Sequence, residues 1–559
     1  MLMRNTRICY LSWFQKFPSA LLLLIPIALI YLGFQLRSAG GHFSLFATDP
    51  EFIFLFSGLA ITIGHIDLFT VQPGTPIQVL EGFIARIIHL FRPGTSFPDD
   101  VLQHPDLYLH IVSICIILLV AAGVFLAGYI LYRRTGNLPA TLFLQFAPFV
   151  AEQVFATLER AMIEPLFIPF FALFFAYLWL DAMHQLPSYG LAARRVWIYA
   201  IMAGLGLSMK FNFVSFLLIP LFMLRNWKER TSYAFLTTGF FYLFTFPLFI
   251  KTRNFYQWIK SLVLHSGVYG TGDNNVVDIS QFLSHLNTMV HEKKFLFAAI
   301  LVGTLIFLTS YLPSLRKKMK GNPLPSLLAG LLLAQILGIL IIAKHYSERY
   351  LIPELLMVVP LLFVCIQMFI RMIPERFGRV DYILYALIVY LLAIHPQTFR
   401  QHRMYLPLKK KIFEAKLESI RYLRQFPTPD ALLLSSDNWS ICPEYGLFFG
   451  MLMTPNGRNI FGSYLNKIYP NTYLFKEYDG RFFDWFDQPH PAGELLSQYR
   501  TAILVANRYN KKIYEQLENL FSTIPETEIT LAYKNEQTNT RIYLIRNHQN
   551  HSKLLANQR

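Results

Sequence analysis

Two carboxylates, Asp49 and Glu51, stand in the stretch "ATDPEF" where one long apolar run ends and another begins. Acidic side chains are costly beside hydrocarbon, so their position indicates a specific role. A carboxylate at such a surface can accept a proton as a general base. The same letters also suit a helix start, because Thr48 and Glu51 have capping-box spacing and proline fits a first turn. The two roles are compatible, since a cap would hold the acids in place.

Several bases are also predicted near the membrane surface. Lys210 lies in an apolar stretch, where either a functional partner or snorkelling to the interface explains it. Arg349 follows Glu348 at the entrance of a predicted span, where it could bind a phosphate or pair locally. Lys344 and His345 belong to the same short segment. Further candidates for holding an acceptor or a metal ion are Glu152, Glu159 and Glu164, whose alternative role is to pair with a nearby base such as Arg160. His65 and Asp67 could also line the site, and loop polarity explains them equally well.

The elements that position these residues are predicted to be membrane-spanning helices. The chain has 559 residues, of which 54% are hydrophobic, including 51 Phe and 30 Tyr. Apolar runs of roughly 17 to 25 residues recur, which is the length that crosses a bilayer as a helix. We therefore expect a polytopic α-helical membrane protein whose first span is a retained signal anchor. The spans predicted, about eleven, are residues 18–36, 108–132, 138–157, 164–182, 195–209, 211–225, 232–250, 294–313, 324–343, 350–370 and 381–396.

The charge distribution predicts the orientation. Lys and Arg number 50 against 34 Asp and Glu, a net charge of +16. The basic residues cluster in short segments that alternate with less basic ones, which indicates the positive-inside pattern and not a nucleic-acid surface. The N-terminus is then cytoplasmic and the C-terminal part extracytoplasmic. The clusters are Arg4, Arg7, Lys16; Arg133, Arg134; Arg194, Arg195; Arg225, Lys228, Arg230; Arg316, Lys317, Lys318, Lys320; and Arg371, Arg376, Arg379.

Two domains are expected. Residues 1–398 form the transmembrane module, and residues 399–559 alternate short β-like runs such as "TAILVAN" with amphipathic helices. This alternation predicts a small extracytoplasmic α/β domain. The first outer loop, residues 37–107, has an order of its own: the acidic pair, a short apolar segment, the rigid turn "VQPGTP", and the amphipathic run Pro76 to Phe91. Such a run is expected to lie in the interface.

This order resembles the GT-C superfamily of integral-membrane glycosyltransferases, which includes protein mannosyltransferases and aminoarabinose transferases. There an acidic pair opens the first extracytoplasmic loop, and interfacial helices follow. "QPGTP" looks like the Pro-Gly element found downstream in bacterial members, and "KHYSERYLIPELL" looks like the later R-Y-x-x-P element. "GLSMKFNFVSFLLIPLFML" resembles the span pair with a buried lysine. The resemblance covers roughly residues 1 to 400.

The resemblance implies transfer of a sugar from a polyprenyl-phosphate donor to an acceptor hydroxyl outside the cytoplasm of a bacterial inner membrane. It makes Asp49 the general base, with Glu51 orienting it or helping to bind, and assigns Lys210, Arg349, Lys344 and His345 to the donor phosphate. The acceptor is a glycan, a lipid or a protein, and the participation of a divalent cation, Mg²⁺ or Mn²⁺, stays open. The alternatives are a transporter or lipid-linked glycan flippase, which usually shows internal repeats not evident here, and a scaffold protein.

Overall fold

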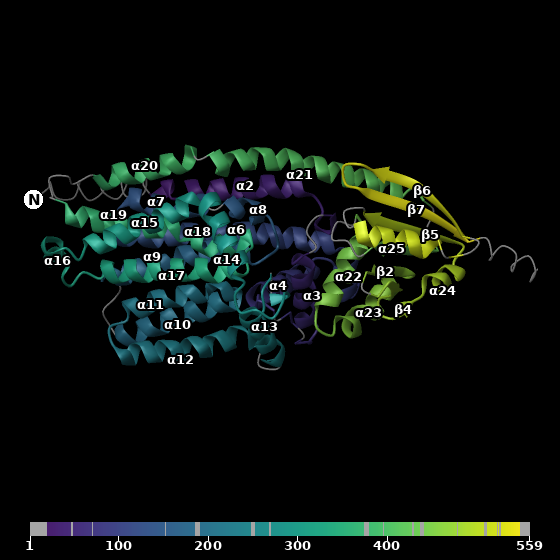
Figure 1. The fold of residues 1–559 in the computed structure, drawn as a ribbon, viewed down its shortest axis with the longest axis horizontal. Coiled ribbons are helices and arrows are strands. Elements are labelled where there is room, and N and C mark those ends of the chain that lie inside the picture. The colour runs from purple at the N-terminus through teal and green to yellow at the C-terminus, as the bar shows by residue number, and fades with distance from the viewer. Residues whose placement is uncertain are drawn as a thin grey trace, which may run out of the picture.

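The structure is a computed structural model, in which a bundle of helices at one end adjoins a seven-stranded sheet at the other (Figure 1). It describes residues 19–45, 49–66, 68–69, 71–150, 152–184, 191–246, 252–267, 270–373, 380–394, 396–426, 430–435, 441–477, 479–507, 511–522, 524 and 527–547. A polytopic helical protein with a C-terminal α/β domain was expected, and the architecture confirms this class. The predicted helix start at Thr48 lies outside the described residues.

Five helices in the described part of the chain are long and apolar enough to cross a membrane. A sixth span would be a pair of helices, Lys294–Thr309 and Pro313–Met319, bent by 94°. Eleven uninterrupted spans are therefore not confirmed. The five are Ser19–Gly40, Pro105–Thr135, Glu164–Ala182, Leu324–Lys344 and Glu348–Met372.

The other predicted spans coincide with shorter, charged or interrupted helices. The predicted span 138–157 divides into α7 (Leu138–Gln145), a 3-10 turn (Ala147–Val150) and α8 (Glu152–Thr157). Pro148 stands in that turn, where its missing N–H prevents a continuous helix. The helix α10 (Leu191–Met209) ends before Lys210, and a 3-10 segment (Phe211–Leu217) leads into α11 (Leu218–Met223).

The remaining helices of the bundle, in chain order, are α2 (Leu24–Gly40), α6 (Pro105–Thr135), α9 (Phe167–Ala182), α12 (Trp227–Phe244), α13 (Thr252–Leu264), α14 (Ile279–Glu292), α15 (Lys294–Thr309), α16 (Pro313–Met319), α17 (Leu324–Lys344), α18 (Ile352–Leu356), α19 (Val358–Met372), α20 (Val380–Ile394) and α21 (Pro396–Leu423).

The first outer loop folds into three helices, α3 (Glu51–Thr62), α4 (Thr75–Leu90) and α5 (Phe97–Gln103). The helices α3 and α4 cross at Gly58 and Gly82: a Cβ added at Gly58 would meet the backbone nitrogen of Gly82 at 2.7 Å. Only glycine permits this approach, which seats the apolar α3 against the amphipathic α4. Almost every residue of α3 is buried.

The C-terminal part is a seven-stranded mixed sheet of order β4-β3-β2-β1-β5-β7-β6. The central strand β1 pairs in parallel with β2 and β5, and the other neighbours are antiparallel. Both faces carry apolar side chains under helices. The elements are β1 (Ala431–Ser435), α22 (Pro443–Met453), α23 (Gly457–Ile468), β2 (Thr472–Lys476), β3 (Arg481–Phe483), β4 (Pro489–His490), α24 (Ala492–Ser497), β5 (Thr501–Asn507), α25 (Lys511–Ser522), β6 (Thr527–Asn535) and β7 (Thr540–Asn547).

The sheet domain rests on the first outer loop. Gly446 and Gly450 of α22 lie against the rings of Phe52 and Phe56 of α3, which therefore has a second helix packed on it. The helix α21 continues through the expected boundary at residue 398 and joins the bundle to the sheet (Figure 1). The acidic motif at the start of α3 consequently lies where the two parts of the molecule meet.

Candidate active site

A cavity of about 800 Å³ lies beside the start of α3. Its walls come from segments far apart in the sequence, and five polar residues line it. Those five are Asp49, Gln72, Glu164, Lys210 and Arg349. The remaining lining residues are Pro50, Ile53, Phe54, Phe69, Val71, Gly74, Ile163, Met209 and Met453. The cavity thus brings together Asp49, Lys210 and Arg349, which the sequence assigns to one site.

The two predicted acids have different environments. Asp49 is exposed, and it precedes Pro50, the residue at the N-terminal boundary of α3. Glu51 is completely buried, and its two carboxylate oxygens accept hydrogen bonds from Nε and Nη2 of Arg160 at 2.6 and 2.8 Å. Nη2 of Arg160 also donates to the backbone carbonyl of Asp49 at 2.7 Å. The guanidinium of Arg160 therefore holds both the Glu51 side chain and the Asp49 backbone, and the Asp49 carboxylate is left to line the cavity.

The electrostatics of this anchor act on its two partners differently: burial raises the pKa of the Glu51 carboxyl even with Arg160 beside it. Burial alone would lower the pKa of Arg160, but the neighbouring Glu51 carboxylate outweighs burial and raises it. The guanidinium consequently keeps its charge at physiological pH. Bidentate pairing of this kind fixes geometry as well as charge.

The opposite wall of the cavity carries two cations. Nζ of Lys210 lies 2.6 Å from Oε1 of Glu164 and 4.7 Å from the ring centroid of Tyr350. The guanidinium carbon of Arg349 lies 5.8 Å from the same ring centroid. Lys210 reaches this position because its backbone is extended (φ −160°, ψ 137°) between α10 and the 3-10 segment that follows. The interruption between α10 and the 3-10 segment thus places the side chain of Lys210 at the cavity.

An apolar groove of about 530 Å³ adjoins the cavity. Gln72 and Lys210 line both spaces. The groove is otherwise lined by residues of the 3-10 segment, α13, α17 and the turn before α18. These are Phe211, Asn212, Trp258, Leu262, Ile341, Ile342, His345 and Tyr350. A cavity that carries charged side chains thus borders an apolar groove along a shared edge, a combination suited to an amphiphile.

The predicted phosphate ligands Lys344 and His345 contact the C-terminal end of α13. Nζ of Lys344 donates to the carbonyls of Leu262 and Val263. Nε2 of His345 lies 2.8 Å from the carbonyl of Leu262. These contacts satisfy helix-end carbonyls and hold α13 as a wall of the groove. Lys344 therefore has a structural task here, and a contact of either residue with a donor phosphate stays a prediction.

Among the other predicted acids whose side chains the structure describes, Glu164 lines the cavity with Asp49 and Glu159 does not. Glu159 is buried between Arg37, 3.1 Å away, and Lys409 of α21. His65 is exposed beyond the end of α3. Glu152 begins α8, but its side chain, like all of Asp67, lies outside what the structure describes. Glu159 therefore forms ion pairs, and pairing with a base was the alternative role expected for this cluster.

A metal site made of protein side chains alone does not fit the described residues. No group of three or more His, Cys, Asp or Glu side chains converges among them. The cavity offers two carboxylates, and one of these already contacts Lys210. Use of Mg²⁺ or Mn²⁺ therefore stays an untested prediction, and no step below depends on it.

Two residues of the site were not predicted, and a third, Arg160, was expected only as a partner of the nearby acids in the "ERAMIEP" segment. Gln72 belongs to the "VQPGTP" turn, whose position was noted but whose side chain was not. Met453 comes from α22 of the sheet domain, and nothing in the sequence links it to the first loop.

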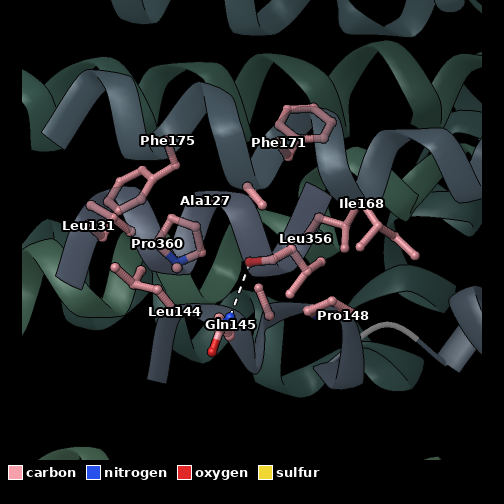
Figure 2. Close-up of a pocket in the computed structure, with 14 residues that line it drawn as sticks. Ala127, Leu131, Leu144, Gln145, Pro148, Ile168, Phe171, Phe175, Leu356 and Pro360 are labelled. Atoms are coloured by element: carbon pink, nitrogen blue, oxygen red, sulfur yellow. Dashed lines mark hydrogen bonds between the residues drawn. The ribbon is translucent and has the colours of Figure 1, made fainter. Parts of the chain in front are cut away.

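A second cavity lies among the helices and has a different character. Figure 2 shows it enclosed by apolar side chains, among them Leu131, Phe171 and Phe175. Gln145 is the single polar residue among those that line it, and its Nε2 donates to the carbonyl of Val124 at 3.1 Å. No titratable side chain lines this space. This second cavity therefore offers no group for proton transfer, whereas the cavity at Asp49 does.

Comparisons with known proteins yield similar structures but no sequence family. No family model and no curated protein matches the chain. The chain is similar to the crystal structure of ArnT from Cupriavidus metallidurans bound to undecaprenyl phosphate, with 13% identity, a TM-score of 0.46, and coverage of 94% of this chain and 97% of that one. For the apo state of the same ArnT the identity is 12%, the TM-score 0.47 and the coverage 96% and 98%. At these values the function is argued from the residues of this chain.

Proposed function

We propose that this chain is a membrane glycosyltransferase that moves a sugar from a polyprenyl-phosphate donor to an acceptor hydroxyl on the extracytoplasmic face, in a bacterial inner membrane. The observation that carries the proposal is the adjacency of the two spaces. A cavity with an exposed carboxylate and two cations shares Lys210 and Gln72 with an apolar groove. A polyprenyl-phosphate sugar has the same sequence of parts: an apolar tail, an anion and a polar head.

The proposed binding mode follows from that match. The polyprenyl tail occupies the groove between α13 and α17, where Trp258 and Leu262 provide apolar contact. The phosphate lies at Lys210 and Arg349, whose charges stabilise an anion in a partly water-excluded site. The sugar then projects into the cavity toward Asp49.

The proposed reaction is a displacement at the anomeric carbon. The acceptor hydroxyl gives its proton to the Asp49 carboxylate as its oxygen forms a bond to that carbon. The bond between the anomeric carbon and the phosphate oxygen breaks, and its electron pair leaves with the polyprenyl phosphate. Lys210 and Arg349 stabilise the charge that develops on the leaving group. Glu51 acts through Arg160, which positions Asp49, and does not touch the substrate.

Labelled-sugar transfer in membranes tests the proposal. The substitution Asp49→Asn keeps the size of the side chain but removes the base, and we expect transfer to fall roughly 100- to 10,000-fold. Asp479→Asn, on the exposed surface of the sheet domain, is the matched control and should transfer normally. Equal rates in all three proteins would reject Asp49 as the base. Movement of the labelled lipid across the bilayer without any sugar transfer would favour the flippase alternative.

A further inference from the structure

Gln72 is held in an unusual backbone conformation at the edge shared by the cavity and the groove. Its φ is +69°, in the left-handed region that non-glycine residues rarely adopt. The next residue is Pro73, and a residue before proline is normally confined to extended backbone. A glutamine is therefore a poor choice here on local grounds alone.

Buried contacts from two helices impose this conformation. Gln78 of α4 is completely buried, and its Nε2 donates to the carbonyl of Phe69 at 2.8 Å and to that of Pro73 at 3.0 Å. Oγ of Ser57 in α3, also completely buried, accepts from the backbone nitrogen of Phe69 at 3.2 Å. The loop is therefore held on both sides of Gln72. Strain that the surrounding structure maintains in this way is a recognised mark of functional sites.

The position of Gln72 explains what the strain achieves. Gln72 and Lys210 are the two residues common to the cavity and the groove. In a lipid-linked sugar the phosphate stands between the apolar tail and the polar head, so residues at the shared edge face the phosphate and its bond to the sugar. A carboxamide offers both N–H donors and a carbonyl acceptor. It can donate to a phosphate oxygen and also accept from a sugar hydroxyl. A lysine ammonium group can donate to the phosphate but has no acceptor for the hydroxyl.

We propose that Gln72 is a donor-positioning residue, whose carboxamide hydrogen-bonds the phosphate of the lipid-linked donor at its junction with the sugar. This inference rests on the proposed function and deepens it. Lys210 provides positive charge at the junction, and Gln72 provides a hydrogen bond that orients the phosphate. The left-handed backbone is retained because it keeps the carboxamide at the shared edge.

Replacing Gln72 by glycine separates the effect of backbone strain on stability from the effect of the carboxamide on donor binding. A glycine at this position would adopt the observed backbone without strain, so Gln72→Gly should unfold at the same or a higher temperature. We expect its affinity for decaprenyl phosphate to fall about tenfold, while its weak affinity for decaprenol, which lacks the phosphate, stays unchanged. Gln72→Glu keeps the shape but adds a negative charge, and it should bind decaprenyl phosphate still less. Asn539→Gly is the control, since Asn539 also has a positive φ but lies in the β6–β7 turn.

Binding and thermal unfolding of the purified full chain in detergent decide the outcome. A stable Gln72→Gly protein with weakened phosphate-dependent binding supports the inference. The same protein with wild-type affinity for decaprenyl phosphate and wild-type sugar transfer overturns it and leaves the proposed function standing. A wild-type protein that does not distinguish decaprenyl phosphate from decaprenol overturns both.

Discussion

At the scale of single residues, Arg160 decides how the acidic motif works. Its guanidinium holds the Glu51 carboxylate and the Asp49 carbonyl together, so Asp49 is presented on a fixed backbone. A buried carboxylate is tolerated when it is paired and hydrogen-bonded. Substitution of Asp49 is therefore expected to reduce sugar transfer, and substitution of Glu51 is expected to reduce stability.

The substitution Glu51→Gln should act mainly on stability. It removes the charge opposite Arg160 and leaves a partly buried guanidinium without its bidentate partner, at a cost of about 3 kcal/mol in the free energy of unfolding. Asp49→Asn changes an exposed side chain and should unfold like the wild type. Denaturation in detergent compares the two. If Glu51→Gln kept wild-type stability, the anchoring role assigned to Arg160 would be wrong.

Acid sensitivity is also a residue property, and it is expected at Asp100 in α5. Burial alone would raise the pKa of Asp100, but hydrogen bonds from Arg92 and Tyr108 outweigh burial and lower the pKa from 3.8 to about 2. The folded state therefore holds the ionised form more strongly than the unfolded state does. This stabilisation is complete above about pH 4 and is lost as the pH falls through about 2.

The variant Asp100→Asn should be less stable than the wild type at neutral pH. The difference in unfolding temperature between the two proteins should shrink as the pH falls from about 4 toward about 2, because protonation removes the same interaction from the wild type. Thermal unfolding across this pH range is the measurement. A difference that stays constant with pH would contradict the assignment.

At the scale of elements, the crossing of α3 over α4 sets the position of the site. A Cβ at Gly58 would meet the carbonyl oxygen of Gln78 at 2.6 Å, a backbone atom that cannot turn aside. Gly58→Ala should therefore push α4 away, lower the free energy of unfolding by about 1 to 3 kcal/mol, and weaken donor binding by moving Gln78. Gly239→Ala in α12 is the control, because a Cβ there meets nothing within 4 Å. It should be neutral or slightly stabilising.

The sequence is informative about elements because hydrophobic length and period are local properties. It predicted the short helix after the acidic pair, the amphipathic helix after the Pro-Gly turn and the C-terminal α/β class. It predicted the break at Lys210, on either side of which a short span was expected. It did not predict the break at Pro148, because the run 138–157 keeps a high average hydropathy across that residue. The pairing of Glu51 with Arg160 and the arrival of Met453 at the cavity depend on tertiary packing, which has no local signal.

At the scale of the whole molecule, the sheet domain and the bundle share the site. Met453 of α22 lines the cavity together with Asp49, and α22 packs on α3 through Gly446 and Gly450. Lys409 of α21 meets Glu159, which also contacts Arg37 of α2. The sheet domain therefore contributes to the wall of the cavity and is not a separate attachment.

This arrangement predicts one orientation in the membrane. The sheet domain and α3 lie toward one end of the helical bundle, and α16 lies toward the other (Figure 1). The helix α16 carries Arg316, Lys317 and Lys318 in its last turn, so the positive-inside pattern places that end in the cytoplasm. Single cysteines on a cysteine-free background test this prediction with a membrane-impermeant maleimide. Asp479→Cys should label in spheroplasts, whereas Lys318→Cys should label only after permeabilisation; the opposite result would place the cavity on the cytoplasmic side and exclude an extracytoplasmic acceptor.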